Sequence, residues 1–250
     1  MTEPSASETS GDVIRYDSTI GESWPARAGY RFFQGLLLLA FKVYFRLTIE
    51  GRENIPRDGA FILAPIHRSY LDTPLMSPVR RRLRFMGKDS MWKNRFTAWF
   101  LSTMGGFPVS RDMADREALN TTISLLNGGQ PTVLFPEGER KRGPRVHRLK
   151  EGAVYVSART GVPIVPVGVG GSEGAMPKGR NFIFPVKIHL VVGEPIPAPE
   201  KKPSGRVSRK SVQANTAELR ETLQQLFDRA QQRCGKPNVY EPGSEPPEMN

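Results

Sequence analysis

Two side chains in the first third of the chain have the types and the spacing of a general base and its orienting carboxylate. His67 ends an apolar run that begins at Ala60, and Asp72 follows it five residues later. A neutral imidazole can remove a proton from an alcohol near pH 7, and a carboxylate bound to its second nitrogen fixes the tautomer and stabilises the imidazolium. The pair therefore indicates activation of a substrate hydroxyl group.

The local context also allows a purely structural interpretation of this pair. Residues 60–66 are expected to form a strand, and Ser69 with Asp72 has the pattern of a capping box at the start of a helix over residues 69–77. His67 would then lie between a strand end and a helix start, where open α/β sheets tend to bind ligands. In the alternative interpretation, Ser69 and Asp72 only cap this helix and His67 only fills a turn.

Cations follow two other expected strands. A short apolar segment precedes Arg111, and the strand expected at 132–135 runs directly into a charged turn that contains Glu137, Arg140 and Lys141. The three cations could gather at strand ends, and Glu137 could orient one of them by pairing with it. The planar guanidinium of arginine suits a phosphate group, and lysine offers a compact charge. A solvated basic rim is the competing interpretation for each cation taken alone.

Four short segments of the sequence, in their order along the chain, resemble the motifs of the membrane-associated glycerolipid acyltransferases. The resemblance is specifically to the 1-acylglycerol-3-phosphate (lysophosphatidic acid) acyltransferases. The His-x4-Asp motif of that family falls on His67 and Asp72. Its other three motifs fall on residues 106–111, 135–140 and 162–167. The similarity covers about residues 50–197 and includes Lys88 and the segment 192–196.

Two residues depart from the pattern of the family. Ile66 stands where asparagine often precedes the histidine, and Glu139 stands where threonine is usual in the third motif. Glu139 adds a negative charge beside the expected phosphate site, which weakens that site unless the side chain points away or pairs with Lys141 or Arg142.

The resemblance implies an acyl-CoA-dependent O-acyltransferase that esterifies lysophosphatidate to phosphatidate in phospholipid biosynthesis, without a cofactor beyond the co-substrate acyl-CoA. His67 would deprotonate the acceptor hydroxyl, Asp72 would hold the histidine, and the oxygen would attack the thioester directly. The residues expected to position the acceptor phosphate are Arg111, Glu137 and Arg140, with Lys88 or Lys141 nearby and Gly138 for close backbone approach. Glycerol 3-phosphate or another lysolipid is the alternative acceptor.

The composition is compatible with this function and with others. The 250 residues include 36 lysines and arginines against 25 aspartates and glutamates, a net charge of +11. This excess favours an anionic partner such as a membrane surface, a nucleic acid or a polyphosphorylated cofactor. A non-catalytic basic protein would explain the charge, but the four ordered motifs would become accidental. A thioesterase or other hydrolase is a third possibility. No nucleic-acid partner is expected, because the sequence contains no recognisable nucleic-acid-binding module.

The order of elements predicts an α/β fold with a mostly parallel or mixed sheet of about seven strands flanked by helices. The strands are expected near 47–51, 60–66, 83–86, 106–109, 132–135, 164–169 and 187–192. The helices are expected near 69–77, 90–104, 113–127, 151–160 and 211–233. Four segments follow from this reading: a polar stretch at 1–28, an amphipathic helix at 29–47, the acyltransferase domain at 48–233 and a disordered tail at 234–250.

The amphipathic segment 29–47 predicts peripheral or monotopic attachment to the cytoplasmic face of the cell membrane. Polar residues interrupt it too often for a membrane span, and residues 1–28 lack the pattern of a secretory signal. Its broad apolar face would include Tyr30, Phe33, Leu37, Phe41 and Tyr44. A basic amphipathic helix of this kind suits an anionic bilayer, although packing on the core of the domain is the alternative.

Other segments are candidates for membrane contacts or for rival sites. Residues 91–104 mix aromatic and basic side chains, and the basic runs 80–82 and 141–150 would face lipid or coenzyme A phosphates. Residues 170–174 match the Gly-x-Ser-x-Gly pattern of serine hydrolases, but a proline follows where that motif requires a helix. The three histidines are scattered outside any compact metal-binding motif, so no metal is expected.

Overall fold

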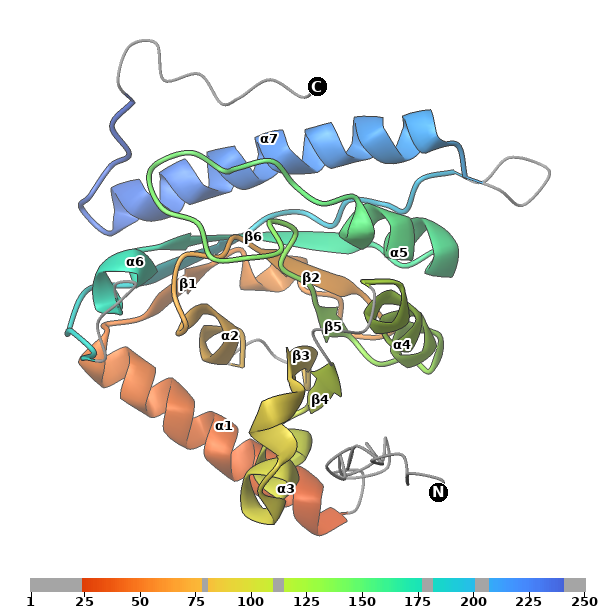
Figure 1. Ribbon diagram of the computed structural model, residues 1–250. Coiled ribbons are helices and arrows are strands. Elements are labelled where there is room, and N and C mark those ends of the chain that lie inside the picture. The colour runs from red at the N-terminus through yellow and green to blue at the C-terminus, as the bar shows by residue number, and fades with distance from the viewer. Residues whose placement is uncertain (1–23, 78–80, 110–114, 177–181, 201–206, 241–250) are drawn as a thin grey trace, which may run out of the picture.

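The computed structural model places one central sheet between layers of helices (Figure 1). It describes residues 24–77, 81–109, 115–176, 182–200 and 207–240. Within these stretches, seven strands form a sheet in the order β1-β7-β6-β2-β5-β3-β4. They are β1 (Thr48–Glu50), β2 (Ile62–Pro65), β3 (Arg84–Lys88), β4 (Gly106–Val109), β5 (Thr132–Val133), β6 (Ile164–Gly170) and β7 (His189–Val192).

The sheet is mixed and mostly parallel, which confirms the fold class expected from the sequence. Neighbouring strands are parallel except β6 and β7, which are antiparallel. Because β2, β5 and β3 are parallel neighbours, their C-terminal ends lie at the same edge of the sheet. His67, the residues after β5 and Lys88 all lie at this edge, which gathers chain segments that are far apart in sequence.

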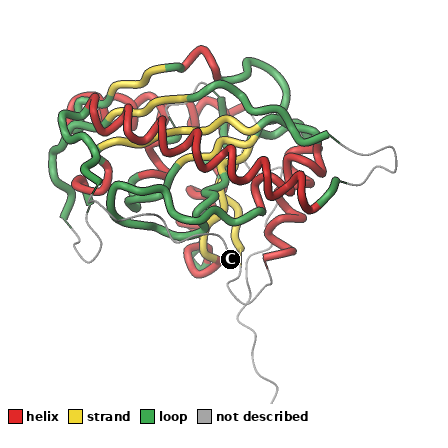
Figure 2. Tube along the Cα trace, turned by 90° about the horizontal axis from the view of Figure 1, so that it is seen from above, coloured by secondary structure: helices red, strands yellow, loops and turns green. Residues whose placement is uncertain are grey.

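The middle of the sheet is covered on both faces. All seven residues of β6 and all four of β2 are buried, which is the pattern of strands between two layers of helices. The long helix α7 (Arg209–Arg233) runs over these strands, as Figure 2 shows from above. A Cβ atom on Gly168 or Gly170 would lie 2.3 Å from the α7 backbone, so this close packing requires glycine at both positions.

The remaining helices in the described part of the chain are all shorter than α7, and α1 is the longest of them. They are α1 (Trp24–Tyr44), α2 (Asp72–Leu75), α3 (Arg95–Thr103), α4 (Asp115–Asn127), α5 (Gly152–Thr160) and α6 (Ser172–Ala175), with the 3-10 helices η1 (Arg52–Asn54) and η2 (Asp89–Trp92). Figure 1 shows α7 on one side of the sheet and α1 and α2 on the other.

Several boundaries differ from the sequence-based expectation. The helix expected at 69–77 is a single turn that begins at Asp72, because the residues before it form a turn held by the Asp72 carboxylate. The helix expected at 90–104 is divided into η2 and α3, since Asn94 adopts an extended conformation and caps α3 by accepting from the Phe96 amide. α6 was not expected.

The ends of the chain also differ from expectation. α1 begins at Trp24 instead of residue 29 and ends at Tyr44, before Arg46 with its positive φ of 48°. Most of the polar stretch expected at 1–28 lies outside the described residues. Residues 241–250 of the expected tail also lie outside them.

The apolar face expected to meet the membrane packs largely on the domain. Tyr30 and Phe41 are each only 6% exposed, and the ring of Phe33 contacts Phe100 of α3 edge-on with 5.7 Å between centroids. The outward side of α1 carries a second apolar set, Trp24, Phe32, Leu36, Leu39 and Val43, each more than half exposed. None of the helices in the described residues is long and apolar enough to cross a membrane.

Candidate active site

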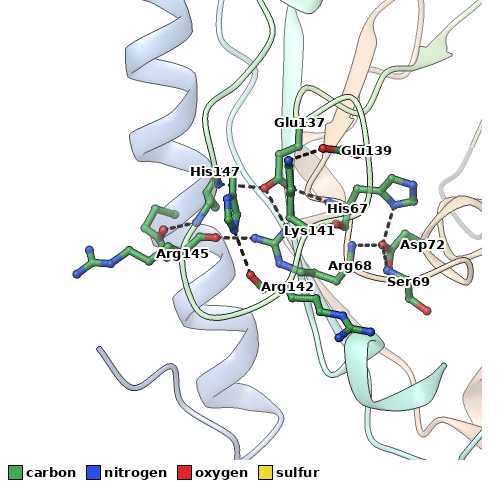
Figure 3. A network of polar contacts seen from close by, with 12 residues as sticks. His67, Arg68, Ser69, Asp72, Glu137, Glu139, Lys141, Arg142, Arg145 and His147 are labelled. Atoms are coloured by element: carbon green, nitrogen blue, oxygen red, sulfur yellow. Dashed lines mark hydrogen bonds and ion pairs between the residues drawn. The ribbon is translucent and has the colours of Figure 1, made fainter. Parts of the chain in front are cut away.

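The imidazole of His67 lies directly beyond β2 and is held from both of its sides. Its Nδ1 is 3.0 Å from Oδ2 of Asp72, and a dashed line marks this contact in Figure 3. Its ring stacks on Phe135, with 4.0 Å between ring centroids. Because the carboxylate can only accept at Nδ1, the neutral ring keeps its proton there and Nε2 has a free lone pair. The His67 side chain is 18% exposed and that of Asp72 is fully buried.

The carboxylate of Asp72 both caps the turn and orients the imidazole. Its Oδ2 accepts hydrogen bonds from the backbone amides of Arg68 at 2.6 Å and Ser69 at 2.7 Å. The hydroxyl of Ser69 accepts from the amide of Leu71 at 3.3 Å. The two interpretations of the pair are therefore compatible, because the same oxygen performs both tasks.

His67 borders a cleft of about 630 Å³ at the C-terminal edge of β3 and β5. Its walls are mainly apolar, and Lys88 and Lys150 are the basic residues among the described lining residues. The other lining residues are Phe85, Met86, Gly87, Val109, Ala118, Leu119, Val133, Leu134, Phe135, Pro136, Gly138, Glu151, Gly152 and Ala153. Such a cleft can hold an apolar chain together with an anionic group.

The side chain of Lys150 lies over Gly138, and both residues line the cleft. A Cβ atom on Gly138 would lie 2.7 Å from Cε of Lys150, and Gly138 has a φ of 72°. The amide of Lys150 donates to the carbonyl of Pro136 at 2.8 Å, which fixes the start of its side chain. Gly138 therefore allows the lysine side chain to approach closely, whereas its expected role toward the acceptor phosphate stays a prediction. The sequence placed Lys150 only within a basic run.

Two of the expected phosphate-binding cations contact other groups. The guanidinium of Arg140 lies over the ring of Tyr70 at 3.4 Å from its centroid. The ammonium of Lys141 pairs with Glu139 at 2.5 Å, and its amide donates to the carbonyl of His67 at 2.8 Å. The extra negative charge of Glu139 is thus paired with Lys141. Arg111 lies outside the described residues.

The environment of Glu137 differs from the expectation that it would orient a phosphate-binding cation of the second or third motif. Its carboxylate is fully buried and pairs with Arg68 at 2.7 Å. An arginine immediately after the histidine gives no local signal of this role, because its partner is 69 residues away in the sequence. The structure therefore brings His67, Lys88 and Gly138 to the cleft, with Glu137 behind it.

Comparison with known proteins adds a family and several relatives. The profile of the family described as Acyltransferase matches residues 46–170. The chloroplast 1-acyl-sn-glycerol-3-phosphate acyltransferase LPAT1 of Arabidopsis thaliana is 29% identical over 178 residues, which are 69% of this chain and 50% of the relative. The chain spans about half the length of the plant and algal relatives it matches.

A bacterial relative and a crystal structure agree more closely in length. The 1-acyl-sn-glycerol-3-phosphate acyltransferase of Bacillus subtilis is 26% identical over 169 residues, 67% of this chain and 82% of the relative. The crystal structure of the 1-acyl-sn-glycerophosphate acyltransferase PlsC from Thermotoga maritima superposes with a TM-score of 0.66. It is 27% identical and 80% of each chain is covered.

Proposed function

The chain belongs to the acyltransferase family, and from this premise we propose that it transfers an acyl group from acyl-CoA to a hydroxyl of lysophosphatidate, giving phosphatidate. The observation that carries the proposal is the bond between His67 Nδ1 and Asp72 Oδ2 beside a mainly apolar cleft. The names of the plant and bacterial relatives support this choice of acceptor. Coenzyme A is proposed as the thiol that carries the acyl group because the sequence resembles the motifs of the acyltransferase family.

The reaction follows from the free lone pair on Nε2 of His67. This nitrogen removes the hydroxyl proton while the acceptor oxygen attacks the carbonyl carbon of the thioester. The C–O bond forms, the C–S bond breaks, and the imidazolium returns its proton to the departing thiolate. Asp72 stabilises the transient positive charge on the ring, and no acyl-enzyme is formed.

The cleft offers complementary surfaces for an acyl chain and for an anionic group. We assign the phosphate of the acceptor to Lys88 and Lys150, which line the same cleft as His67. Arg111, Arg140 and Lys141 are proposed to assist binding of the acceptor phosphate through their positive charge. Glu137 is withdrawn from this group because its carboxylate is buried against Arg68.

We also propose that the protein lies at the cytoplasmic interface of the membrane, because the proposed acceptor is a lipid. Exposed apolar side chains of α1 and α3 would enter the bilayer surface, among them Phe32, Leu36, Phe96 and Trp99. These two helices pack together through the Phe33 and Phe100 rings. Exposed cations beside them on α1, such as Lys42, would favour anionic lipid.

One assay tests the function. Purified protein is incubated with lysophosphatidate and either acyl-CoA or an acyl carrier protein thioester, and both the free thiol and phosphatidate are measured. Equal amounts of thiol and phosphatidate are expected with acyl-CoA. Product with only the carrier protein would correct the donor, thiol without phosphatidate would indicate a thioesterase, and neither product would overturn the proposed function.

A further inference from the structure

A fully enclosed ion pair lies directly behind the catalytic histidine. Nη1 of Arg68 is 2.7 Å from Oε2 and 3.0 Å from Oε1 of Glu137. The side chains are 1% and 0% exposed, respectively. Residues of this charge are rarely buried without a partner, and here each supplies the counter-charge of the other.

The pair also holds the backbone on which the site is built. Oε2 of Glu137 accepts from the amide of His67 at 3.0 Å, and Oε1 accepts from the amide of His147 at 3.0 Å. Arg68 donates to the carbonyl of Arg145 at 2.9 Å and to that of His67 at 3.1 Å. Figure 3 shows these bonds converging on the Glu137 carboxylate and the Arg68 guanidinium.

Three separate segments are joined at this point. They are the turn after β2, the turn after β5, and the loop at 141–150, which helix α7 holds from outside. On α7, Gln224 accepts from the Val146 amide at 2.7 Å, and the ring of Phe227 lies 5.0 Å from the Arg68 guanidinium carbon. The pair therefore fixes the main chain of His67, while Asp72 fixes the imidazole ring through Nδ1.

We propose that Arg68 and Glu137 are positioning residues, which set the orientation of His67 for acyl transfer through its backbone amide and carbonyl. This proposal rests on the proposed function of the site. A direct role of Glu137 with the acceptor phosphate is disfavoured, because two anions repel and the carboxylate is enclosed. A role in stability alone makes a different prediction, since buried ion pairs can often be replaced by neutral residues without loss of stability.

The test uses the single variants Arg68→Met and Glu137→Gln and the variant with both changes. Each single change leaves one buried polar group without its partner, so the melting temperature should fall. The double variant should recover much of that loss, because no buried charge is left unpaired. The amide introduced by Glu137→Gln still has only one carbonyl oxygen for two backbone amides, so His67 remains poorly oriented.

The decisive measurement is the turnover of the folded double variant. We expect kcat about 10²-fold below that of the wild type, the size of effect that small misplacements of a catalytic group produce, with an unchanged KM for lysophosphatidate. Glu53→Gln and Arg57→Met remove the same charges from exposed positions and should leave kcat unchanged. Wild-type kcat in the double variant would overturn the proposal, and so would a raised KM with normal kcat.

A second measurement does not depend on activity. The Glu137 carboxylate accepts from the His67 amide, so hydrogen exchange at this amide should be faster in the double variant than in the wild type. Unchanged exchange would overturn the positioning role even in a sample that is inactive. If exchange is faster in the double variant but the wild-type protein makes no phosphatidate, the contact is supported and only the proposed function is contradicted. The failure of this inference and the failure of the proposed function are therefore distinguishable.

Discussion

The side chain of Lys150 lies directly over the backbone of Gly138, so the absence of a Cβ at one residue determines where the charge of another lies. Both residues line the cleft that His67 borders. The third motif thus contributes to the cleft through a glycine that makes room, while its glutamate is buried and its arginine stacks on Tyr70.

Replacement of Gly138 by alanine is expected to displace Lys150. The new Cβ would lie 2.7 Å from Cε of the lysine, and a φ of 72° adds backbone strain of roughly 1–2 kcal/mol. Gly129→Ala is the matched control, because Gly129 has a φ of 77° with open space around its Cβ position. Both variants should lose similar stability, but only Gly138→Ala should raise the KM for lysophosphatidate. Equal KM values in the two variants would show that the position of Lys150 is unimportant.

The hydrogen-bonded pair His67 and Asp72 makes the sharpest prediction for turnover. His67→Ala should abolish acyl transfer in a folded protein, and Asp72→Asn should lower kcat by about 10²-fold or more, since positioned general bases contribute about 10²–10⁴-fold. Asp72→Asn should also destabilise the turn, because its Oδ2 accepts two backbone amides. Circular dichroism separates this loss from the loss of turnover. Near-normal turnover of folded His67→Ala protein would contradict the mechanism.

The two cleft lysines should act on the acceptor more than on the donor. Lys88→Met and Lys150→Met would each remove the charge-assisted hydrogen bond proposed for the acceptor phosphate, and this should raise the KM for lysophosphatidate by about 10- to 150-fold. Lys210→Met, at an exposed position at the start of α7, is the control with the same loss of charge. Titration of each substrate at saturating levels of the other is the measurement. A selective effect on acyl-CoA would assign the lysines to the coenzyme.

Much of the fold could be predicted from the sequence because its signals are local. Apolar runs between glycines and prolines located all seven described strands, and β6 differs from the expected range 164–169 by one residue. The single turn α6 was missed since four residues are too few to show helical periodicity. The order of strands in the sheet depends on pairing between distant segments, which no local pattern contains.

The site was partly predictable for the same reason. His67 and Asp72 are five residues apart, so the sequence offered the hydrogen bond that the structure contains as one of two interpretations of the pair. The pairing of Arg68 with Glu137 depends on how two turns meet across the edge of the sheet. The side chain of Arg140 could not be placed either, because its contact with Tyr70 arises only after both turns have folded.

The burial of His189, the first residue of β7, predicts that the stability of the protein depends on pH. Burial lowers the pKa of His189 below its ordinary value of 6.5, against the opposing effect of Glu50. The unfolded chain therefore binds more protons below pH 6.5, so stability is complete above that pH and decreases as the pH falls. Melting temperatures measured across this range should fall less in His189→Gln than in the wild type. A parallel fall in both proteins would exclude His189 as the cause.

The outward side of α1 predicts how the protein binds to membranes. Leu36 and Leu39 are 53% and 59% exposed, and burial of two such side chains in a bilayer should contribute about 2–3 kcal/mol, or about 30- to 150-fold in partitioning. The variant Leu36→Ser with Leu39→Ser should therefore sediment far less with anionic liposomes than the wild type. Val239→Ser, at a position that is 76% exposed, is the control for loss of an exposed apolar group.

Salt separates the two contributions to this binding. Each cation near an anionic surface adds about 1 kcal/mol, and this part is screened by salt, whereas the apolar part is not. Wild-type sedimentation should therefore weaken at high salt without vanishing, and the leucine double variant should sediment less than the wild type at both salt concentrations because its apolar contribution is smaller. Equal sedimentation of the variant and the wild type under both conditions would exclude this face of α1. The membrane contact would then belong to α3, where Phe96 and Trp99 are exposed.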